Sequence, residues 1–354
     1  MASKRVLGIL STLVCASLLA ACAGGESEGS GKKGDGKLTF VAYGGDGQKT
    51  MEEAWQKPYM KKNPGVSFVN TSPTDVAQVK AQVQSGQVKW DVIATSPAAA
   101  EQNCGTLFEP LEITGVKRSE LVEQSIGKCY TGNFINATPI AYRTKAFPDP
   151  AKAPKTVADF FDTKKFPGKR GLVNNLQNGI LEYPLLADGV PPGNLYPLDV
   201  DRSLKKLDTI RDQTTFAPNV GALQQAVGAG QVDIFALPDS RITPLLQDGV
   251  DITVVWDVTV TSINGFAVPK GSSEKKNAEK FMAWVLGPEA SANISQALGT
   301  APINKAAKPN LSKEAKQVEV YGPANTGKTV LQDIDWYAKN FNDVTTKLQN
   351  WLAG

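Results

Sequence analysis

Histidine is absent from the whole sequence of 354 residues. Because histidine is the commonest general base and the commonest metal ligand, its absence excludes the serine triad and its cysteine–histidine relatives. Four cysteines, two of them outside the expected folded body, are too few for a cysteine-rich zinc site. Carboxylate pairs remain available, so a secreted carboxylate-based hydrolase stays open as an alternative. We expect no enzyme, no metal ion and no cofactor.

An excess of one charge is also lacking. The chain carries 38 basic and 35 acidic residues, and without Lys4 and Arg5 the basic residues fall to 36. Nucleic acids and anionic lipid surfaces are bound through clustered positive charge. The composition therefore predicts no nucleic-acid partner.

Long apolar runs are missing too. After Lys4 and Arg5 the uncharged stretch at residues 6–21 is shorter than the roughly 20 apolar residues that a membrane-spanning helix needs. Positive charge, an apolar stretch and small residues in this order predict a signal peptide at residues 1–21. A plain secretory signal, which is cleaved without lipid attachment, is the alternative.

The end of this stretch, Leu-Ala-Ala-Cys at residues 19–22, resembles the lipobox of bacterial lipoproteins. The resemblance implies cleavage before Cys22, acylation of that cysteine, and anchoring on the outer face of the cytoplasmic membrane, at the cell surface or in the periplasm. Residues 22–37 have no apolar side chain larger than alanine apart from the cysteine itself, which predicts a flexible linker. Cys104 and Cys129 remain as an even pair in an oxidising compartment, so we expect a disulfide between them.

The folded body alternates short β-rich runs with amphipathic stretches, the pattern of an α/β fold. The last helix is expected to place Ile334, Phe341, Val344, Leu348 and Trp351 along one buried stripe. The expected strands are 38–43, 66–70, 90–96, 171–175, 232–237, 251–256 and 263–268, and the expected helices are 48–63, 76–87, 202–213, 221–229, 278–286 and 333–352.

One motif, Gly-Pro-Ala-Asn-Thr-Gly-Lys-Thr at residues 322–329, matches the pattern of a phosphate-binding P-loop. A P-loop joins a strand to a helix and needs further strands to carry the acid that binds magnesium. Too few residues follow Thr329 for such strands, so we expect a glycine- and proline-containing loop before the last helix.

The order of several short motifs resembles the solute-binding proteins of ABC importers, and most closely the spermidine/putrescine-binding family of two-lobed, type II binding proteins. The resemblance implies two lobes, each a mainly parallel sheet flanked by helices, with the ligand cleft between them. The implied division is 38–136 plus 266–303 for lobe 1 and 137–265 plus 304–354 for lobe 2. The motifs that carry it lie at residues 40–45, 90–96, 137–143, 154–161, 254–256, 265–271, 302–307 and 335–340.

The same resemblance implies which residues bind the ligand. Tyr43 stands where the family has an aromatic wall, and Thr95 and Ser96 end a strand at the cleft, where their hydroxyls either bind the ligand or cap the next helix. Asp239 and Arg241 match a segment that carries polar cleft groups. The full implied set is Tyr43, Gly44, Thr95, Ser96, Asn136, Asp239, Arg241, Asn264 and Asp335.

The polyamine site of that family is not intact here, because Asn264 stands where polyamine binders have an aspartate. An ammonium group needs a carboxylate or an aromatic face to replace its hydration. Asp239 or Asp335 remains to hold one ammonium, and Arg241 or Arg143 to grip a carboxylate. We therefore expect a small zwitterion, for instance an ω-amino acid, or a polyamine-like amine as the ligand.

The resemblance also implies the protein's partners. A monomer that closes on its ligand would deliver it to the permease subunits of an ABC importer in the membrane. A surface lipoprotein that senses its ligand by the same closure is the second alternative.

Overall fold

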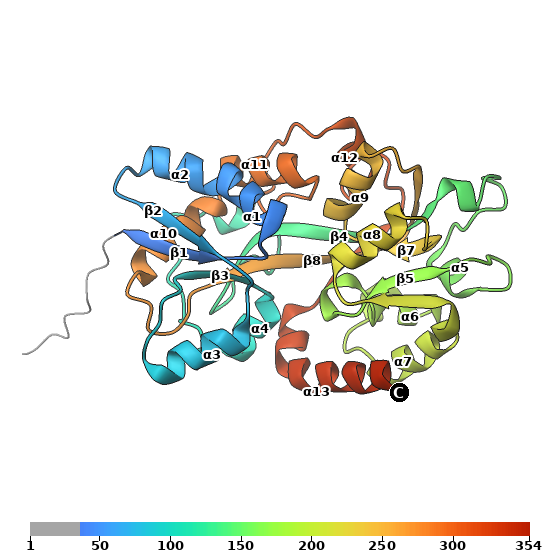
Figure 1. Ribbon diagram of the computed structural model, residues 1–354, viewed down its shortest axis with the longest axis horizontal. Helices are drawn as coiled ribbons and strands as arrows, with labels where there is room; N and C mark the ends of the chain where they lie inside the picture. The colour runs from blue at the N-terminus through green and yellow to red at the C-terminus, as the bar shows by residue number, and fades with distance from the viewer. Residues whose placement is uncertain (1–35) are drawn as a thin grey trace, which may run out of the picture. The chain divides into compact units, whose positions relative to one another are not determined.

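The computed structural model describes residues 36–354, so the predicted signal peptide and the lipid site at Cys22 lie outside the described residues. In this part of the chain nine strands form one sheet in the order β2-β1-β3-β8-β4-β7-β5-β6, with β9 paired to β8 (Figure 1). The strands are β1 (Lys37–Val41), β2 (Ser67–Thr71), β3 (Val92–Thr95), β4 (Thr131–Arg143), β5 (Arg170–Val173), β6 (Thr214–Ala217), β7 (Ile234–Ala236), β8 (Ile252–Ala267) and β9 (Lys328–Leu331).

Two long antiparallel strands, β4 and β8, run through the middle of this sheet and connect two parallel groups. On one side β1 pairs in parallel with β2 and β3, and on the other β5 pairs in parallel with β6 and β7. We call these sides, with the helices packed on them, the β1 half and the β5 half. Two parallel groups flanked by helices agree with the expected fold class. The lobe boundaries stay a prediction.

The prediction of separate strands at 251–256 and 263–268 was wrong, because β8 is continuous over 16 residues. The residues between them, Asp257–Ser262, include alternating valine and threonine, which suits a pleated strand buried on both sides. Strand β9 pairs in parallel with this middle part, from Val258 to Thr261. Lys328 and Thr329 of the P-loop-like motif therefore open a strand and not a helix, which excludes a P-loop.

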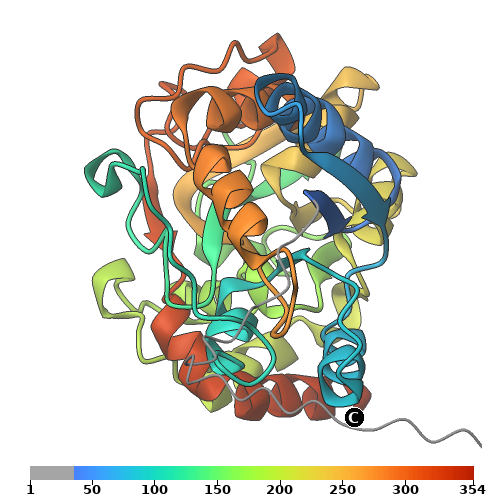
Figure 2. The ribbon, with the colours of Figure 1, turned by 90° about the vertical axis from the view of Figure 1, so that its left-hand side faces the viewer.

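Helices cover both halves of the sheet. In the β1 half, α11 packs against α1 and against the π-helix at Glu52–Gln56 that joins α1 to α2, and Figure 2 shows the orange helices beside the blue ones. In the β5 half, α5 packs on α6, α6 on α7, α8 on α9, and α9 on α12. The bounds are α1 (Gly45–Met51), α2 (Lys57–Lys62), α3 (Val76–Ser85), α4 (Pro97–Gln102), α5 (Val157–Phe161), α6 (Glu182–Ala187), α7 (Val200–Asp208), α8 (Val220–Gly228), α9 (Asp239–Gln247), α10 (Lys275–Val285), α11 (Pro288–Leu298), α12 (Lys313–Gln317) and α13 (Ile334–Ala353).

Local sequence explains where these helices begin. The side chain of Asp75 accepts a hydrogen bond from the first turn of α3, and Asn219 does the same for α8. Thr156 and Asp159 form a reciprocal capping box at the start of α5. Such caps satisfy backbone N–H groups that have no partner inside the helix, and each contributes about 1 kcal/mol.

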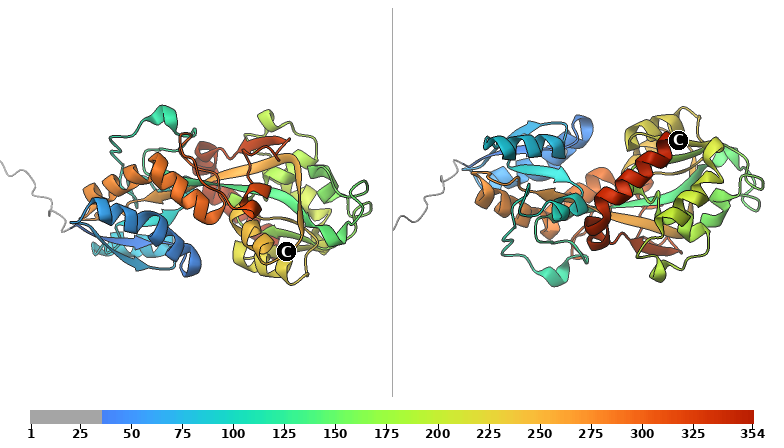
Figure 3. Two further views of the ribbon diagram at one scale, coloured as in Figure 1. Left: turned by 90° about the horizontal axis from the view of Figure 1, so that it is seen from above. Right: turned by 90° about the horizontal axis from the view of Figure 1, so that it is seen from below.

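Helix α13 joins the two halves. Its first part lies against α4 and its later part against α7, and the right view of Figure 3 shows it running from one half to the other. The predicted stripe is confirmed: Ile334, Val344 and Leu348 are buried, while Phe341 and Trp351 are partly buried against the same core.

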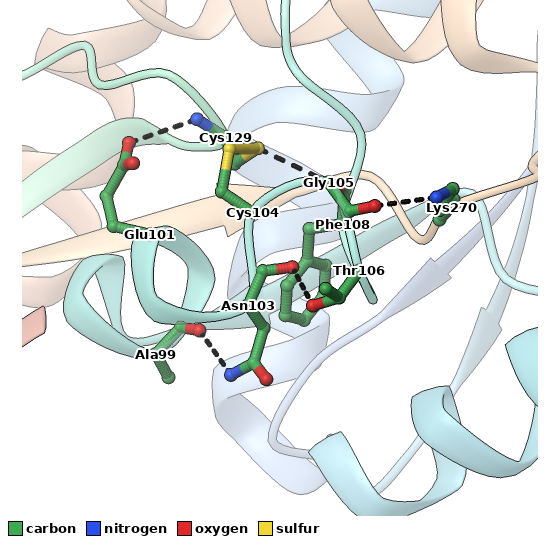
Figure 4. The surroundings of a disulfide bond; sticks show 9 residues. All are labelled: Ala99, Glu101, Asn103, Cys104, Gly105, Thr106, Phe108, Cys129 and Lys270. Atoms are coloured by element: carbon green, nitrogen blue, oxygen red, sulfur yellow. Dashed lines mark hydrogen bonds between the residues drawn. A yellow bond between two sulfur atoms is a disulfide. The ribbon is translucent and has the colours of Figure 1, made fainter. Parts of the chain in front are cut away.

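A disulfide closes the segment between α4 and β4 (Figure 4). Cys104 and Cys129 are bonded, with their Cα atoms 5.4 Å apart. The carboxylate of Glu101 accepts a hydrogen bond from the backbone N–H of Cys129 at 3.0 Å, beside the bridge. The excursion at residues 105–128 is thus attached to the β1 half at both of its ends.

Candidate functional site

The carboxyl ends of β1, β3 and β7 meet at the middle of the long pair β4 and β8. Tyr43 follows β1 and bonds to Asn264 in β8, whereas Thr95 ends β3 with Gly265 of β8 as its partner in the sheet. Asp239 follows β7 and accepts a hydrogen bond from Ala137 in β4. Ligands of open parallel sheets lie beyond the carboxyl ends of strands. This region is the candidate binding cleft, between the β1 half and the β5 half.

Tyr43 provides an aromatic face. Its hydroxyl donates to Asn264 Oδ1 at 3.0 Å, while 46% of the side chain's surface stays exposed. Burial raises the pKa of the Tyr43 hydroxyl to about 12. Tyr43 therefore stays neutral and acts as a hydrogen-bond donor at physiological pH.

Gly44 turns the chain from β1 into α1. Its φ of 75° lies in the left-handed region, and a Cβ atom at this position would lie 2.9 Å from Ser72 Oγ. Glycine is the residue that adopts this conformation without a steric penalty. The turn leads into α1, where the negative charge of Asp46 lies close enough to act on the guanidinium of Arg241.

Asp239 is a buried carboxylate without a cationic partner. Its side chain is 1% exposed and accepts backbone N–H bonds from Ala137 at 3.2 Å and from Ser240 at 2.7 Å. Among the described residues it makes no salt bridge. Burial raises the pKa of Asp239 well above its ordinary value, more than the two backbone bonds lower it.

Arg241 is the corresponding unpaired cation, two residues further along α9. Within residues 36–354 it has no salt bridge and no side-chain hydrogen bond. Burial lowers the pKa of its guanidinium, and the negative charge of Asp46 from the β1 half opposes that shift. The two opposite charges at the start of α9 thus make no salt bridge within the described residues.

Asn136 and Tyr321 lie close to the start of α9. Ser240 Oγ lies 3.5 Å from Asn136 Oδ1, which places the predicted Asn136 next to α9. Tyr321 is 56% exposed, and the pKa of its hydroxyl is raised first by burial and then by the negative charge of Asp239. Sequence reasoning missed Tyr321, because it lies in an irregular loop with no periodicity to mark it.

The other side of the cleft is a small, mainly apolar pocket. Ser96 contributes to it, and its hydroxyl makes no capping bond to α4, so the capping alternative is excluded. Thr95 beside it is 6% exposed. The lining residues come from both halves and from α13: Ser96, Pro97, Ala98, Leu176, Gln177, Ser262, Ile263, Gln332, Ile334, Tyr337 and Phe341.

Two charged candidates lie elsewhere. Asp335 is exposed on the first turn of α13, where its charge acts on the buried hydroxyl of Tyr130 and not on the start of α9. Arg143 is occupied, because it donates to Asp233 Oδ1 at 3.0 Å and to the carbonyl of Val232 at 3.0 Å. Asp239 and Arg241 are therefore the pair that the structure brings to the cleft.

The described part of the chain has no group of three or more histidine, cysteine or acidic side chains that could hold a metal ion. Within residues 36–354, no helix combines the length and the apolar character that crossing a membrane requires.

Comparison with known proteins gives consistent matches over most of the chain. The family model of the bacterial extracellular solute-binding protein matches residues 54–320. The gamma-aminobutyric acid-binding protein of Pseudomonas aeruginosa is 28% identical over 323 residues, which cover 89% of this chain and 91% of that protein.

Solved structures agree. The structure described as the Atu4243-GABA receptor is 30% identical, with a TM-score of 0.80. The match covers 89% of this chain and 97% of that chain. The binding protein AgtB from A. tumefaciens R10, in complex with agropinic acid, is 29% identical with a TM-score of 0.76, covering 90% of this chain and 99% of its own.

Proposed function

The chain belongs to the family of bacterial extracellular solute-binding proteins, and on that premise we propose that it captures a small ω-amino acid of the chemical class of γ-aminobutyrate. The ligand would lie between the β1 half and the β5 half and be passed to the permease of an ABC importer. We also propose that the protein is a monomer, anchored through a lipid on Cys22. Its family binds solutes, so we propose no enzymatic activity.

One observation carries the choice of ligand class: the start of α9 presents an unpaired carboxylate, Asp239, and an unpaired guanidinium, Arg241. A buried charge without a partner is costly. A zwitterion would pair both groups at once, with its ammonium on Asp239 and its carboxylate held by the two-pronged donor of Arg241. A neutral sugar would leave both charges unpaired.

The directions of the two side chains favour an ω-amino acid over an α-amino acid. Residues two apart on a helix do not face each other. Asp239 points toward Ala137 in β4, whereas Arg241 is under the influence of Asp46 in the opposite half. An α-amino acid carries its ammonium and its carboxylate on the same carbon atom, but an ω-amino acid carries them at opposite ends of its chain. The relatives that bind γ-aminobutyrate support this choice.

The same pair argues against a polyamine. A diamine requires a carboxylate or an aromatic face at each end. Asp239 serves one end, but the guanidinium of Arg241 would repel the second ammonium. Tyr43 and Tyr321, both largely exposed in this region, would flank the apolar methylenes of an ω-amino acid.

Isothermal titration calorimetry of the purified protein tests the proposal. We expect γ-aminobutyrate to bind with one-to-one stoichiometry. Butyrate lacks the ammonium and putrescine lacks the carboxylate, so each should bind at least about tenfold more weakly, which corresponds to about 1.4 kcal/mol. Absence of γ-aminobutyrate binding, or putrescine binding more tightly than γ-aminobutyrate, would show the ligand class to be wrong.

Substitutions assign the two charges. Asp239→Asn and Arg241→Gln should each weaken γ-aminobutyrate binding by more than about tenfold. Asp335→Asn is the matched control, because Asp335 is an exposed acid outside the cleft, and it should leave affinity unchanged. If the control weakened binding as much as Asp239→Asn, the assignment of the ammonium to Asp239 would be contradicted.

A further inference from the structure

The segment that opens α13 is hydrogen-bonded to the β5 half through a buried carboxylate. Glu182, at the start of α6, is fully buried, and its Oε1 accepts from Tyr337 at 2.6 Å and from Gln332 at 2.7 Å. Tyr196 donates to the same oxygen at 2.7 Å. Gln332 also donates to the carbonyl of Leu176 at 2.7 Å. Three of these hydrogen bonds, one from Tyr337 and two from Gln332, attach this segment to the β5 half, and the bond from Tyr196 holds Glu182 in place.

The same segment makes one hydrogen bond to the β1 half, where α13 also packs on α4. Gln124, in the excursion at residues 105–128, accepts through Oε1 from the backbone N–H of Ile334 at 3.0 Å. Its backbone carbonyl accepts from the Tyr130 hydroxyl at 2.7 Å. Gln124 is half-buried, in contrast to the cluster around Glu182.

The backbone of Gln124 is strained. Its φ of 59° makes it the single non-glycine residue of the described chain with a left-handed conformation. Such a conformation is disfavoured for a residue with a Cβ atom and persists where surrounding contacts hold it, often at clamps and switches. Here the two hydrogen bonds of Gln124 hold it.

Residues of this turn also line the cleft. Ile334 and Tyr337 form part of the apolar pocket between Ser96 of the β1 half and Gln177 of the β5 half. Any movement of one half relative to the other must therefore change the surroundings of this turn.

We propose that the first turn of α13 is a conformational latch whose releasable contact is the hydrogen bond between Gln124 and Ile334. The cluster around Glu182 keeps the turn on the β5 half in both arrangements of the protein. The Gln124 bond forms in the arrangement described here and breaks when the halves move, because Gln124 belongs to the β1 half and the turn stays with the β5 half. It therefore biases the equilibrium between the two arrangements toward the present one.

This inference rests on the movement of two halves in the proposed function, but it does not depend on the identity of the ligand. The test is therefore made without ligand. Cysteines introduced by Lys80→Cys on α3 and Lys205→Cys on α7, both at exposed positions in opposite halves, carry a pair of fluorophores. Single-molecule energy transfer between them reports how the population divides between the two arrangements.

Gln124→Asn is the informative variant. Asparagine tolerates the left-handed backbone, but its side chain is one methylene shorter and does not reach Ile334. We expect the ratio of the two populations to shift about fivefold away from the wild-type arrangement, the effect of losing one ordinary hydrogen bond. Gln124→Glu is the matched control, since a carboxylate of the same length keeps the acceptor at a helix N-terminus, and it should behave as wild type.

Unchanged populations in Gln124→Asn would overturn the latch, and so would equal shifts in the Asn and Glu variants. Failure of γ-aminobutyrate to bind would contradict the proposed ligand and leave this result unaffected.

Discussion

Replacing Asp239 with asparagine should weaken ligand binding and change the free energy of unfolding. The direction of that change should depend on pH. Burial raises the pKa of Asp239 above its ordinary value of 3.8, so the folded protein holds this proton more tightly than the unfolded chain does. Stability contributed by the protonated form is complete below about pH 4 and is lost as pH rises toward the raised pKa. Asparagine does not ionise, so the variant escapes this loss.

The magnitude follows from the surroundings of the carboxylate. An uncompensated buried charge costs about 3–5 kcal/mol. Against this, both oxygens of Asp239 accept backbone N–H bonds, from Ala137 and Ser240. Asparagine keeps one acceptor and turns its amide donors toward the other N–H, which costs about 1–3 kcal/mol. We therefore expect Asp239→Asn to be about 2 kcal/mol more stable than wild type at pH 8 and less stable below pH 4.

Urea unfolding at pH 4, 6 and 8 without ligand measures this difference, with Asp335→Asn as the exposed control, whose free energy of unfolding should follow that of wild type at each pH. In a second series, γ-aminobutyrate at a hundred times the wild-type dissociation constant should add about 2.7 kcal/mol to wild type and less than about 1.4 kcal/mol to Asp239→Asn, because binding more than tenfold weaker leaves the ligand below about ten times the dissociation constant of the variant. If the Asn variant is less stable than wild type by the same amount at every pH, Asp239 is a satisfied structural carboxylate and the reasoning is refuted.

Three further substitutions test the fold. Arg170 is fully buried and donates to the carbonyls of Phe160, Gly168, Asp162 and Phe166, so Arg170→Met should cost about 3–5 kcal/mol in urea unfolding, whereas Lys164→Met on the exposed loop should stay within about 0.5 kcal/mol. Cys104→Ala removes the disulfide and should lower the free energy of unfolding by about 3 kcal/mol in the same measurement. Treating wild type with an oxidant should change nothing, because its disulfide is already formed. Gly44→Ala forces a Cβ into the left-handed turn beside Ser72 and should lower the melting temperature more than Gly45→Ala, where nothing lies within 4 Å; equal effects would contradict the steric argument.

Much of the fold could be predicted because its elements carry strong local patterns. The stripe of α13 and the alternation of Val66–Asn70 identify a helix and a strand without tertiary information. The failure at β8 has a physical reason: Val258–Thr261 pairs with β9 and Val260–Ser262 pairs with β4, and such non-local pairing leaves no periodic signal. The short strand β9 was missed for the same reason.

The candidate site was predictable in part. Asp239 and Arg241 follow a recognisable buried strand, so their place at its carboxyl end could be inferred. Tyr321 and the Glu182 cluster could not, because a loop position and a buried carboxylate acquire their role from the residues that tertiary packing brings to them. Asp335 shows the converse, since a turn of helix decides whether an acid faces the cleft or the solvent, and the sequence does not set that rotation.

The continuity of β4 and β8 has a consequence for how this protein can change its specificity. Asn136 and Asn264 lie on the strands that connect the two halves, so a substitution there alters the contact with the ligand and the mechanics of the connection together. Residues at the start of α9 and around Tyr321 lie outside these two strands. Descendants of this sequence that acquire new ligands should therefore diverge first at these strand ends and loops, and keep the residues of the central pair.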